Sequence, residues 1–328
     1  MSGKLRFWLG LGLTALSLFA LAQSVDFQET ADALAGVDYF WLAPAVLVIP
    51  PTVWTRAVRW RQLFVPNAGL RVSKLFAILM IGYLINSVLP ARLGDPARAF
   101  LVADLEGVRP AQGIATVVVE RLLDVLTLLA ILLLIMQAVA LPDWMQRSGA
   151  LLGAGAFGGF VALLVLGRQR ERLLPLASAL AARLPRIRPE TASKQVDYLL
   201  SGLDALSSWR NAAGMVALCA IIWAFAVVQA YLVMAAFDIV APPWAAATVV
   251  VVTALGMVVP STPGYLGVFH YFTVVALGLY GVESNVALSY AIVLHVVTFL
   301  PLSLFGLFYL WRESLSLGKV SAGASRLH

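Results

Sequence analysis

Residues 88–94 read VLPARLG and residues 258–264 read VVPSTPG, so a proline followed four residues later by a glycine occurs twice, each time after an apolar run. The runs, 75–89 and 245–259, contain fifteen residues each. A helix of that length extends about 22 Å, less than the roughly 30 Å hydrocarbon core of a bilayer. Proline also interrupts a helix, because it lacks a backbone N–H. We therefore expect two broken helices that enter the membrane and return.

The composition indicates that lipid is the main solvent of this chain. Hydrophobic residues make up 61% of the 328 residues and charged residues only 12%, which excludes a water-soluble protein with a single core. Cys219 is the only cysteine, so disulfide frameworks, CxxC redox pairs and thiolate zinc sites are excluded, and we expect no metal and no cofactor. The motifs GxxxxGK[ST], HExxH and GxSxG are also absent, which excludes ATP-driven transport by this chain alone.

The net charge of +6 points to membrane topology rather than to a nucleic-acid partner. Lysine and arginine favour the cytoplasmic side of a membrane. In this chain they lie before residues 7–22, are frequent in residues 168–210 and occur again after residue 311. Both termini are therefore expected in the cytoplasm. The loop after the first apolar run carries only acidic charges, at Asp26, Glu29, Asp32 and Asp38. Residues 20–22 (ALA) would also fit a signal-peptide cleavage site, although we favour a retained helix.

These features predict an all-α, polytopic protein of the cell (inner) membrane, with six full spans and two re-entrant hairpins. Full spans are expected at 7–22, 39–54, 122–140, 149–167, 212–237 and 286–310. The organisation of the single membrane domain, 1–328, is then a first span 7–22, repeat one 39–140, a connecting span 149–167, a basic cytoplasmic loop 168–210, repeat two 211–311 and a cytoplasmic tail 312–328. Interfacial helices are expected within 171–184. Because the hairpins would enter from opposite sides, they form an inverted repeat, an architecture of transporters; simple proline kinks are the alternative.

The first break, residues 90–94, is charged. Non-helical backbone at membrane depth requires a polar cavity, which Asn86 is placed to line. Asp95 reads as the N-cap of a new helix, whose N-terminus would suit an anion such as a phosphate headgroup. Arg92 and Arg98 flank the break and could add bidentate contacts.

The second break, residues 260–264, is neutral. It offers only small polar and aromatic groups, at Pro260, Ser261, Thr262, Gly264, Tyr265 and, further on, His270. His295 lies on a later span, where helix packing and proton relay are both open interpretations.

Three charged residues open the span after the first hairpin: Glu120, Arg121 and Asp124. Such a charge costs about 2.5–3.5 kcal/mol at the bilayer centre, so we expect ion pairs with Arg92 and Arg98. These pairs could be structural or part of a substrate site. A second basic pair, Arg56 and Arg59, is interpreted as a cytoplasmic boundary.

Four motifs resemble the transmembrane region of lysylphosphatidylglycerol synthase/flippase proteins. They are Arg56-x-x-Arg59-Trp60-x-x-Leu63, Asn86-x-x-Leu89-Pro90-x-Arg92-x-Gly94-Asp95-x-x-Arg98, Glu120-Arg121-x-x-Asp124 and Pro260-x-x-x-Gly264. The resemblance covers nearly the whole chain, although family members more often have Glu where Asp95 stands. It implies handling of aminoacylated phospholipids or of lipids in glycolipid, polyprenyl-phosphate or hopanoid pathways. No aminoacyl-transferase domain follows within these residues, so lysyl transfer is not expected.

The sequence therefore predicts a lipid flippase or transporter that binds an anionic headgroup at the first break. The rival is a non-transporting membrane partner that presents a lipid to a glycosyltransferase or another lipid-modifying enzyme encoded nearby. A weaker third reading is an integral enzyme acting on a lipid phosphate. The expected partner is a membrane lipid with an anionic headgroup, and nucleic acid is not expected.

Overall fold

The computed structural model describes residues 26–64, 69–89, 93–139, 143–182, 209–258 and 262–316, with isolated positions at 12, 14–19, 21, 190, 193–194, 196–197, 200, 318 and 320. Every regular element in these ranges is helical, which confirms the predicted fold class. The elements are α2 (Phe27–Ala35), η1 (Tyr39–Trp41), α3 (Leu42–Leu47), α4 (Ile49–Gln62), α5 (Val72–Val88), α6 (Gly94–Glu106), α7 (Pro110–Ile135), α8 (Asp143–Arg168), α9 (Arg170–Ala181), α11 (Trp209–Ala236), α12 (Pro243–Gly256), η4 (Pro263–Tyr265), α13 (Val268–Gly278) and α14 (Ser284–Arg312). The expected first span, 7–22, lies mostly outside the described residues.

The apolar helices fall into two groups, those long enough to cross a membrane and those too short to do so. Three helical stretches of the described chain are long and apolar enough to cross a membrane: Tyr39–Gln62, Trp209–Ala236 and Ser284–Arg312. The apolar helices α5 and α12 have only 17 and 14 residues. They extend about 26 and 21 Å, short of the roughly 30 Å core. The two predicted short apolar helices are therefore confirmed.

Two boundary predictions were wrong. The helix expected at 122–140 is α7, which begins at Pro110 and ends at Ile135. Proline fits the first turn of a helix, and the charged residues that were taken to start the span lie in its middle, where neighbouring helices pair them. The acidic loop after residue 25 contains α2, whose N-cap Asp26 accepts hydrogen bonds from two backbone N–H groups of the first turn.

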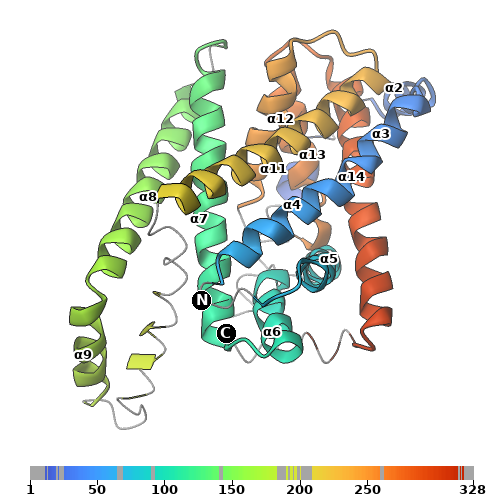
Figure 1. The fold of residues 1–328 in the computed structure, drawn as a ribbon. Helices are drawn as coiled ribbons and strands as arrows, with labels where there is room; N and C mark the ends of the chain where they lie inside the picture. Colours follow the sequence, from blue (N-terminus) through green and yellow to red (C-terminus); the bar gives the residue numbers. More distant parts are fainter. Residues whose placement is uncertain are drawn as a thin grey trace.

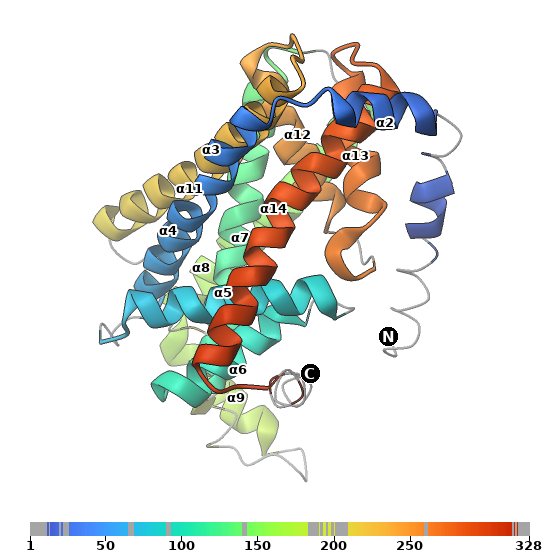
Figure 2. The same ribbon diagram turned by 90° about the vertical axis from the view of Figure 1, so that its right-hand side faces the viewer.

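The short helices form two hairpins (Figures 1 and 2). The antiparallel neighbours α5 and α6 pack together, as do α12 and α13. In Figure 1 the turns before α12 and after α13 lie at the upper end, near α2, whereas α6 lies at the opposite end, near the last turn of α14. The helix α5 is seen end-on in Figure 1 and lengthwise in Figure 2, so it lies across the direction of α7.

Protein rather than lipid surrounds α5. Ten consecutive or near-consecutive residues of this helix are buried, and they form one apolar core with α4 and α6. A second apolar core surrounds α12. A helix buried on all sides is uniformly apolar, which explains why α5 reads as a continuous hydrophobic run.

Glycine permits a close helix crossing between α14 and α5. A Cβ atom built on Gly306 would lie 2.5 Å from the carbonyl oxygen of Met80 and 2.6 Å from Cβ of Leu84. Backbone atoms cannot yield locally, so a side chain at this position would push the two helices apart.

We expect Gly306→Ala to destabilise the protein by about 1–3 kcal/mol through overpacking. The thermal unfolding midpoint of the purified protein in detergent measures this. Gly158→Ala on α8 is the matched control, because a Cβ there meets nothing within 4 Å. Equal midpoints for the two variants would contradict the α5–α14 crossing.

Candidate functional site: a buried charge cluster

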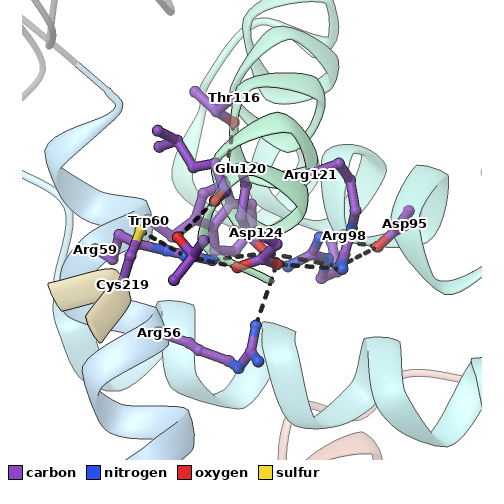
Figure 3. Close-up of polar contacts among 12 residues, drawn as sticks. Arg56, Arg59, Trp60, Asp95, Arg98, Thr116, Glu120, Arg121, Asp124 and Cys219 are labelled. Carbon is purple, nitrogen blue, oxygen red and sulfur yellow. Dashed lines mark hydrogen bonds and ion pairs between the residues drawn. The ribbon is translucent and has the colours of Figure 1, made fainter. Parts of the chain in front are cut away.

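Four arginines and three carboxylates meet between α4, α6 and α7 (Figure 3). We call this group the charge cluster: Arg56, Arg59, Asp95, Arg98, Glu120, Arg121 and Asp124. Its members are separated by up to 68 residues in sequence, yet every one of them has an oppositely charged partner within the group. The expected ion pairs among Arg98, Glu120, Arg121 and Asp124 are therefore confirmed, whereas Arg92 lies outside the described residues.

Arg59 is the fully buried cation on the α4 side. Its Nη1 lies 2.7 Å from Oδ1 of Asp124, and its Nη2 lies 3.7 Å from Oε1 of Glu120. The side chains of Arg59 and Glu120 are 0% exposed. Burying ions costs several kcal/mol each unless they are paired, so these contacts are a condition of the fold.

Arg98 occupies the equivalent place on the α6 side. Its Nη1 lies 3.1 Å from Oε1 of Glu120, and its Nη2 lies 2.8 Å from Oδ1 of Asp95. The guanidinium group also lies 5.3 Å from the centre of the Trp60 ring, a cation–π contact with α4. Glu120 thus accepts a hydrogen bond from Arg98 on α6 and forms an ion pair with Arg59 on α4.

The cluster carries one net positive charge, because four guanidinium groups face three carboxylates. Two of the arginines reach the surface: the side chain of Arg121 is 42% exposed and that of Arg56 is 13% exposed. In the described part of the chain, several buried polar atoms here have no hydrogen-bond partner: Nε of Arg59, Nε of Arg121, Oε2 of Glu120 and Nε1 of Trp223. Unpaired donors beside excess positive charge suit an anionic ligand.

Neutral side chains complete the site, and the sequence interpretation missed them. The indole N–H of Trp60 donates to Thr116 Oγ1 at 3.0 Å, and Arg59 Nη1 donates to Cys219 Sγ at 3.1 Å. Arg56 stacks over Trp223 at 5.5 Å. The adjacency of Trp60 to Arg59 is the one sequence signal for this set, because Cys219 and Trp223 come from the distant helix α11.

The structure gives Arg56 and Arg59 partners that the sequence interpretation did not. Arg59 is buried against Asp124 and Arg56 lies 3.4 Å from the same carboxylate, while their place at the cytoplasmic boundary stays a prediction. Positive charge near the end of an apolar run has two causes, membrane topology and internal pairing, and residue type alone does not separate them.

The first break is organised by Asn86 and Gly94. Asn86 Oδ1 accepts a hydrogen bond from the backbone N–H of Gly94 at 2.8 Å, and a Cβ at Gly94 would overlap the carbonyl oxygen of Gly82. The expected N-cap role of Asp95 is wrong, because α6 begins at Gly94 and the Asp95 side chain pairs with Arg98 and Arg121 instead. Pro90 lies outside the described residues.

The second break lies against the first rather than inside the charge cluster. Gly264 has a left-handed φ of 69°, and a Cβ there would lie 3.5 Å from the carbonyl oxygen of Ser87 on α5. Thr262 shares a hydrogen bond of 3.2 Å with Thr14, and Tyr265 also has a positive φ. His270 lies on α13, while Pro260 and Ser261 fall outside the described residues.

The chemistry of the site favours binding over catalysis. Guanidinium and indole N–H groups recognise oxyanions, and the carboxylates are occupied by arginines. Among the described residues, no group of three His, Cys, Asp or Glu side chains is placed to hold a metal ion.

Glu120→Gln should destabilise the fold by about 3–5 kcal/mol, because Arg59 and Arg98 would lose a buried counter-charge. Denaturant unfolding in detergent measures the change in the free energy of unfolding. The control is Asp143→Asn, whose carboxylate is 85% exposed and pairs with Arg147 at 4.0 Å; we expect a change within about 0.5 kcal/mol. A Glu120→Gln protein as stable as this control would refute a structural role for the cluster.

Comparison with known proteins supports the sequence resemblance. Residues 7–306 match the family described as Lysylphosphatidylglycerol synthase TM region. The chain is similar to Glycosyltransferase AglD of Haloferax volcanii, with 28% identity over 323 residues that cover 88% of this chain and 51% of the relative. It thus spans about half the length of that protein. It is also similar to a UPF0104 membrane protein of Methanothermobacter thermautotrophicus, with 23% identity over 314 residues that cover 90% of this chain and 91% of the relative. The chain therefore belongs to the Lysylphosphatidylglycerol synthase TM region family of membrane proteins.

Proposed function

We propose that this protein is a lipid transporter of the flippase type, which binds an anionic phospholipid or polyprenyl-phosphate headgroup at the charge cluster. The observation that carries the proposal is the excess positive charge, which lies between apolar helices and is partly accessible through Arg121. A phosphodiester headgroup carries one negative charge, which would balance the cluster. The family membership supports a lipid role without specifying the lipid.

Arg121 and Arg56 are the proposed ligand contacts. Nη1 of Arg121 and Nη1 of Arg56 lie 3.5 and 3.4 Å from Asp124 Oδ2, which is looser than the 2.7 Å contact of Arg59 with the same residue, while Nη2 of Arg121 donates to Asp95 Oδ1 at 3.0 Å. A phosphate oxygen can therefore compete for these two arginines while Arg59 and Arg98 keep the helices together. The indole N–H of Trp223, which is free of a partner among the described residues, lies beside Arg56 and can donate to the same ligand.

The proposed membrane arrangement has six spans, two re-entrant hairpins in an inverted repeat and cytoplasmic termini, in the cell (inner) membrane. Three features support it: α5 and α12 are too short to span, each packs against a second short helix, and the chain enters α12 and leaves α13 at the end near α2, whereas α6 lies at the opposite end of the molecule (Figure 1). The acidic residues of α2 lie near the end reached by α12 and α13, as the positive-inside rule requires of an outer face.

In this arrangement the hairpins act as alternating gates. The second break packs on α5 at Ser87, and the first break begins three residues later in the chain, so both hairpins meet at the end of α5. Separation of the hairpins on one side would expose the charge cluster to that side only. A headgroup would then pass between the breaks while its chains remain in lipid.

The rival function is presentation of a lipid to a separate enzyme. The relative named Glycosyltransferase AglD favours it, because this chain matches only about half of that protein. A third reading, an enzyme acting on a lipid phosphate, requires product formation by the purified chain alone. Loss of such a product in Asp95→Asn or Asp124→Asn would favour that enzyme.

Arg56→Gln/Arg121→Gln should weaken binding of an anionic phospholipid about ten- to hundredfold, because two charge-assisted hydrogen bonds are lost. The assay reconstitutes the purified protein in vesicles and follows the access of a membrane-impermeant quencher to labelled headgroups. Transport of labelled phosphatidylglycerol should slow in the double variant.

Arg147→Gln is the matched control, because its arginine is 82% exposed and lies outside the cluster. Control and wild type should transport alike. Headgroup movement no faster than in protein-free vesicles, for every anionic lipid tried, would overturn transport. Lipid retained by the wild type but lost in the double variant, without movement, would favour presentation to a partner.

A further inference from the structure

Two histidines from different helices meet beside the second break. His270 lies on α13 and His295 on α14, with ring centroids 5.0 Å apart and planes inclined by 32°. The two residues are 25 positions apart, so the sequence alone does not indicate that they are in contact. Neither residue belongs to the charge cluster, and the proposed lipid contacts do not use them.

The surroundings of the pair are aromatic. Phe299 stacks on His295 with ring centroids 4.5 Å apart, and Phe269 lies edge-on to both histidines at 5.3 and 6.0 Å. The other titratable side chains on the adjoining elements are Tyr265 on η4, Tyr271 on α13, Tyr290 and Tyr309 on α14, and Lys74 and Tyr83 on α5. Within the bounds given above, η4, α12 and α13 carry no acidic or basic side chain other than His270. The charged residues nearest to His295 along α14 are Glu283 and Arg312, at the two ends of that helix.

The hydrogen bond of His295 determines which of its ring nitrogens can take up a proton. Its Nε2 lies 2.7 Å from the carbonyl oxygen of Gly264. A carbonyl oxygen only accepts, so Nε2 carries the hydrogen and Nδ1 is left to take up a proton. Both rings are half-buried, so a proton can reach them. The two neighbouring imidazoles can share one proton, whereas a second would place like charges about 5 Å apart.

The pair is connected to the gate. His295 holds the carbonyl of Gly264, and Gly264 packs on the backbone of Ser87, the residue that follows Asn86 at the first break. A charge on the pair is costly among phenylalanine rings, since α12, η4 and α13 carry no acidic side chain to balance it, and water relieves this cost. Protonation therefore favours a conformation in which the second break opens to water.

We propose that His270 and His295 form a proton-binding site that opens the second hairpin. Uptake of one proton turns the neutral pair into a cation, which loosens the packing of residues 262–268 against α5. The pair can then couple proton movement to conformational change. This inference concerns the gate and does not depend on which ligand the charge cluster holds.

Cysteine labelling tests the opening directly. In a Cys219→Ser background, Val268→Cys reports on a position that is 0% exposed at the second break. Val240→Cys, at a position fully exposed in the loop before α12, corrects for the intrinsic effect of pH on thiol reactivity. The readout is the ratio of the two labelling rates with a membrane-impermeant thiol reagent, for protein in vesicles without added lipid substrate.

Between about pH 7.5 and about pH 4, a range that extends below the ordinary titration of imidazole because the charged pair is costly among phenylalanine rings, the labelling ratio should rise about tenfold. In His270→Gln/His295→Gln the ratio should not change with pH, since glutamine can still donate to Gly264 but takes up no proton. Phe299→Leu, which loosens the packing without removing a titratable group, should keep the pH dependence. A ratio independent of pH in the histidine-bearing protein, or the same rise in the glutamine variant, would overturn the proposal. If the double variant fails to fold, His295→Gln is tested instead, because it removes the ring whose Nδ1 takes up the proton and should likewise abolish the rise.

Lipid movement in the same vesicles separates this inference from the proposed function. A pH-dependent labelling ratio without transport would support the proton-binding site and contradict the flippase function. Transport with a labelling ratio independent of pH would support the flippase function and contradict the proton-binding site.

Discussion

The pairing of Arg59 and Arg98 with Glu120 is the interaction on which the rest of the structure depends. Glu120 is fully buried in the middle of α7, and the two arginines approach it from α4 and α6. An unpaired ion in this place would cost about 3–5 kcal/mol, a large share of the roughly 5–15 kcal/mol by which a domain is stable. The pairing therefore fixes the three helices in one arrangement, and the outer arginines, Arg56 and Arg121, are the proposed contacts for a ligand.

Close backbone contacts bring those charges together. Gly82 and Gly94 let α5 and α6 approach until the Arg98 side chain lies against α5, and Gly306 lets α14 cross α5. Asn86 then binds the N–H of Gly94, which would otherwise lack an intrahelical partner at the start of α6. Small residues and one amide thus determine where the guanidinium group of Arg98 lies. The geometry of the charge cluster therefore depends on close helix packing as well as on attraction between opposite charges.

The two breaks differ in chemistry but share a surface. The first leads into the charge cluster, and the second leads into an aromatic site with two histidines. Because Gly264 packs on Ser87, movement of one hairpin changes the environment of the other. An ion-binding half and a proton-binding half in contact would allow a gradient of one species to drive movement of the other, which is the physical requirement of secondary transport.

Hydrophobic run length and proline position were sufficient to predict the helical class, the two short helices and the importance of Glu120, Arg121 and Asp124, because these are local properties of the chain. The family resemblance likewise rested on local motifs. Only the tertiary structure decided that Arg59 pairs with Asp124, that Asp95 pairs with arginines rather than capping α6, and that His270 meets His295. Each of these depends on which helix faces which across tens of residues, and a periodic pattern along one helix does not contain that information.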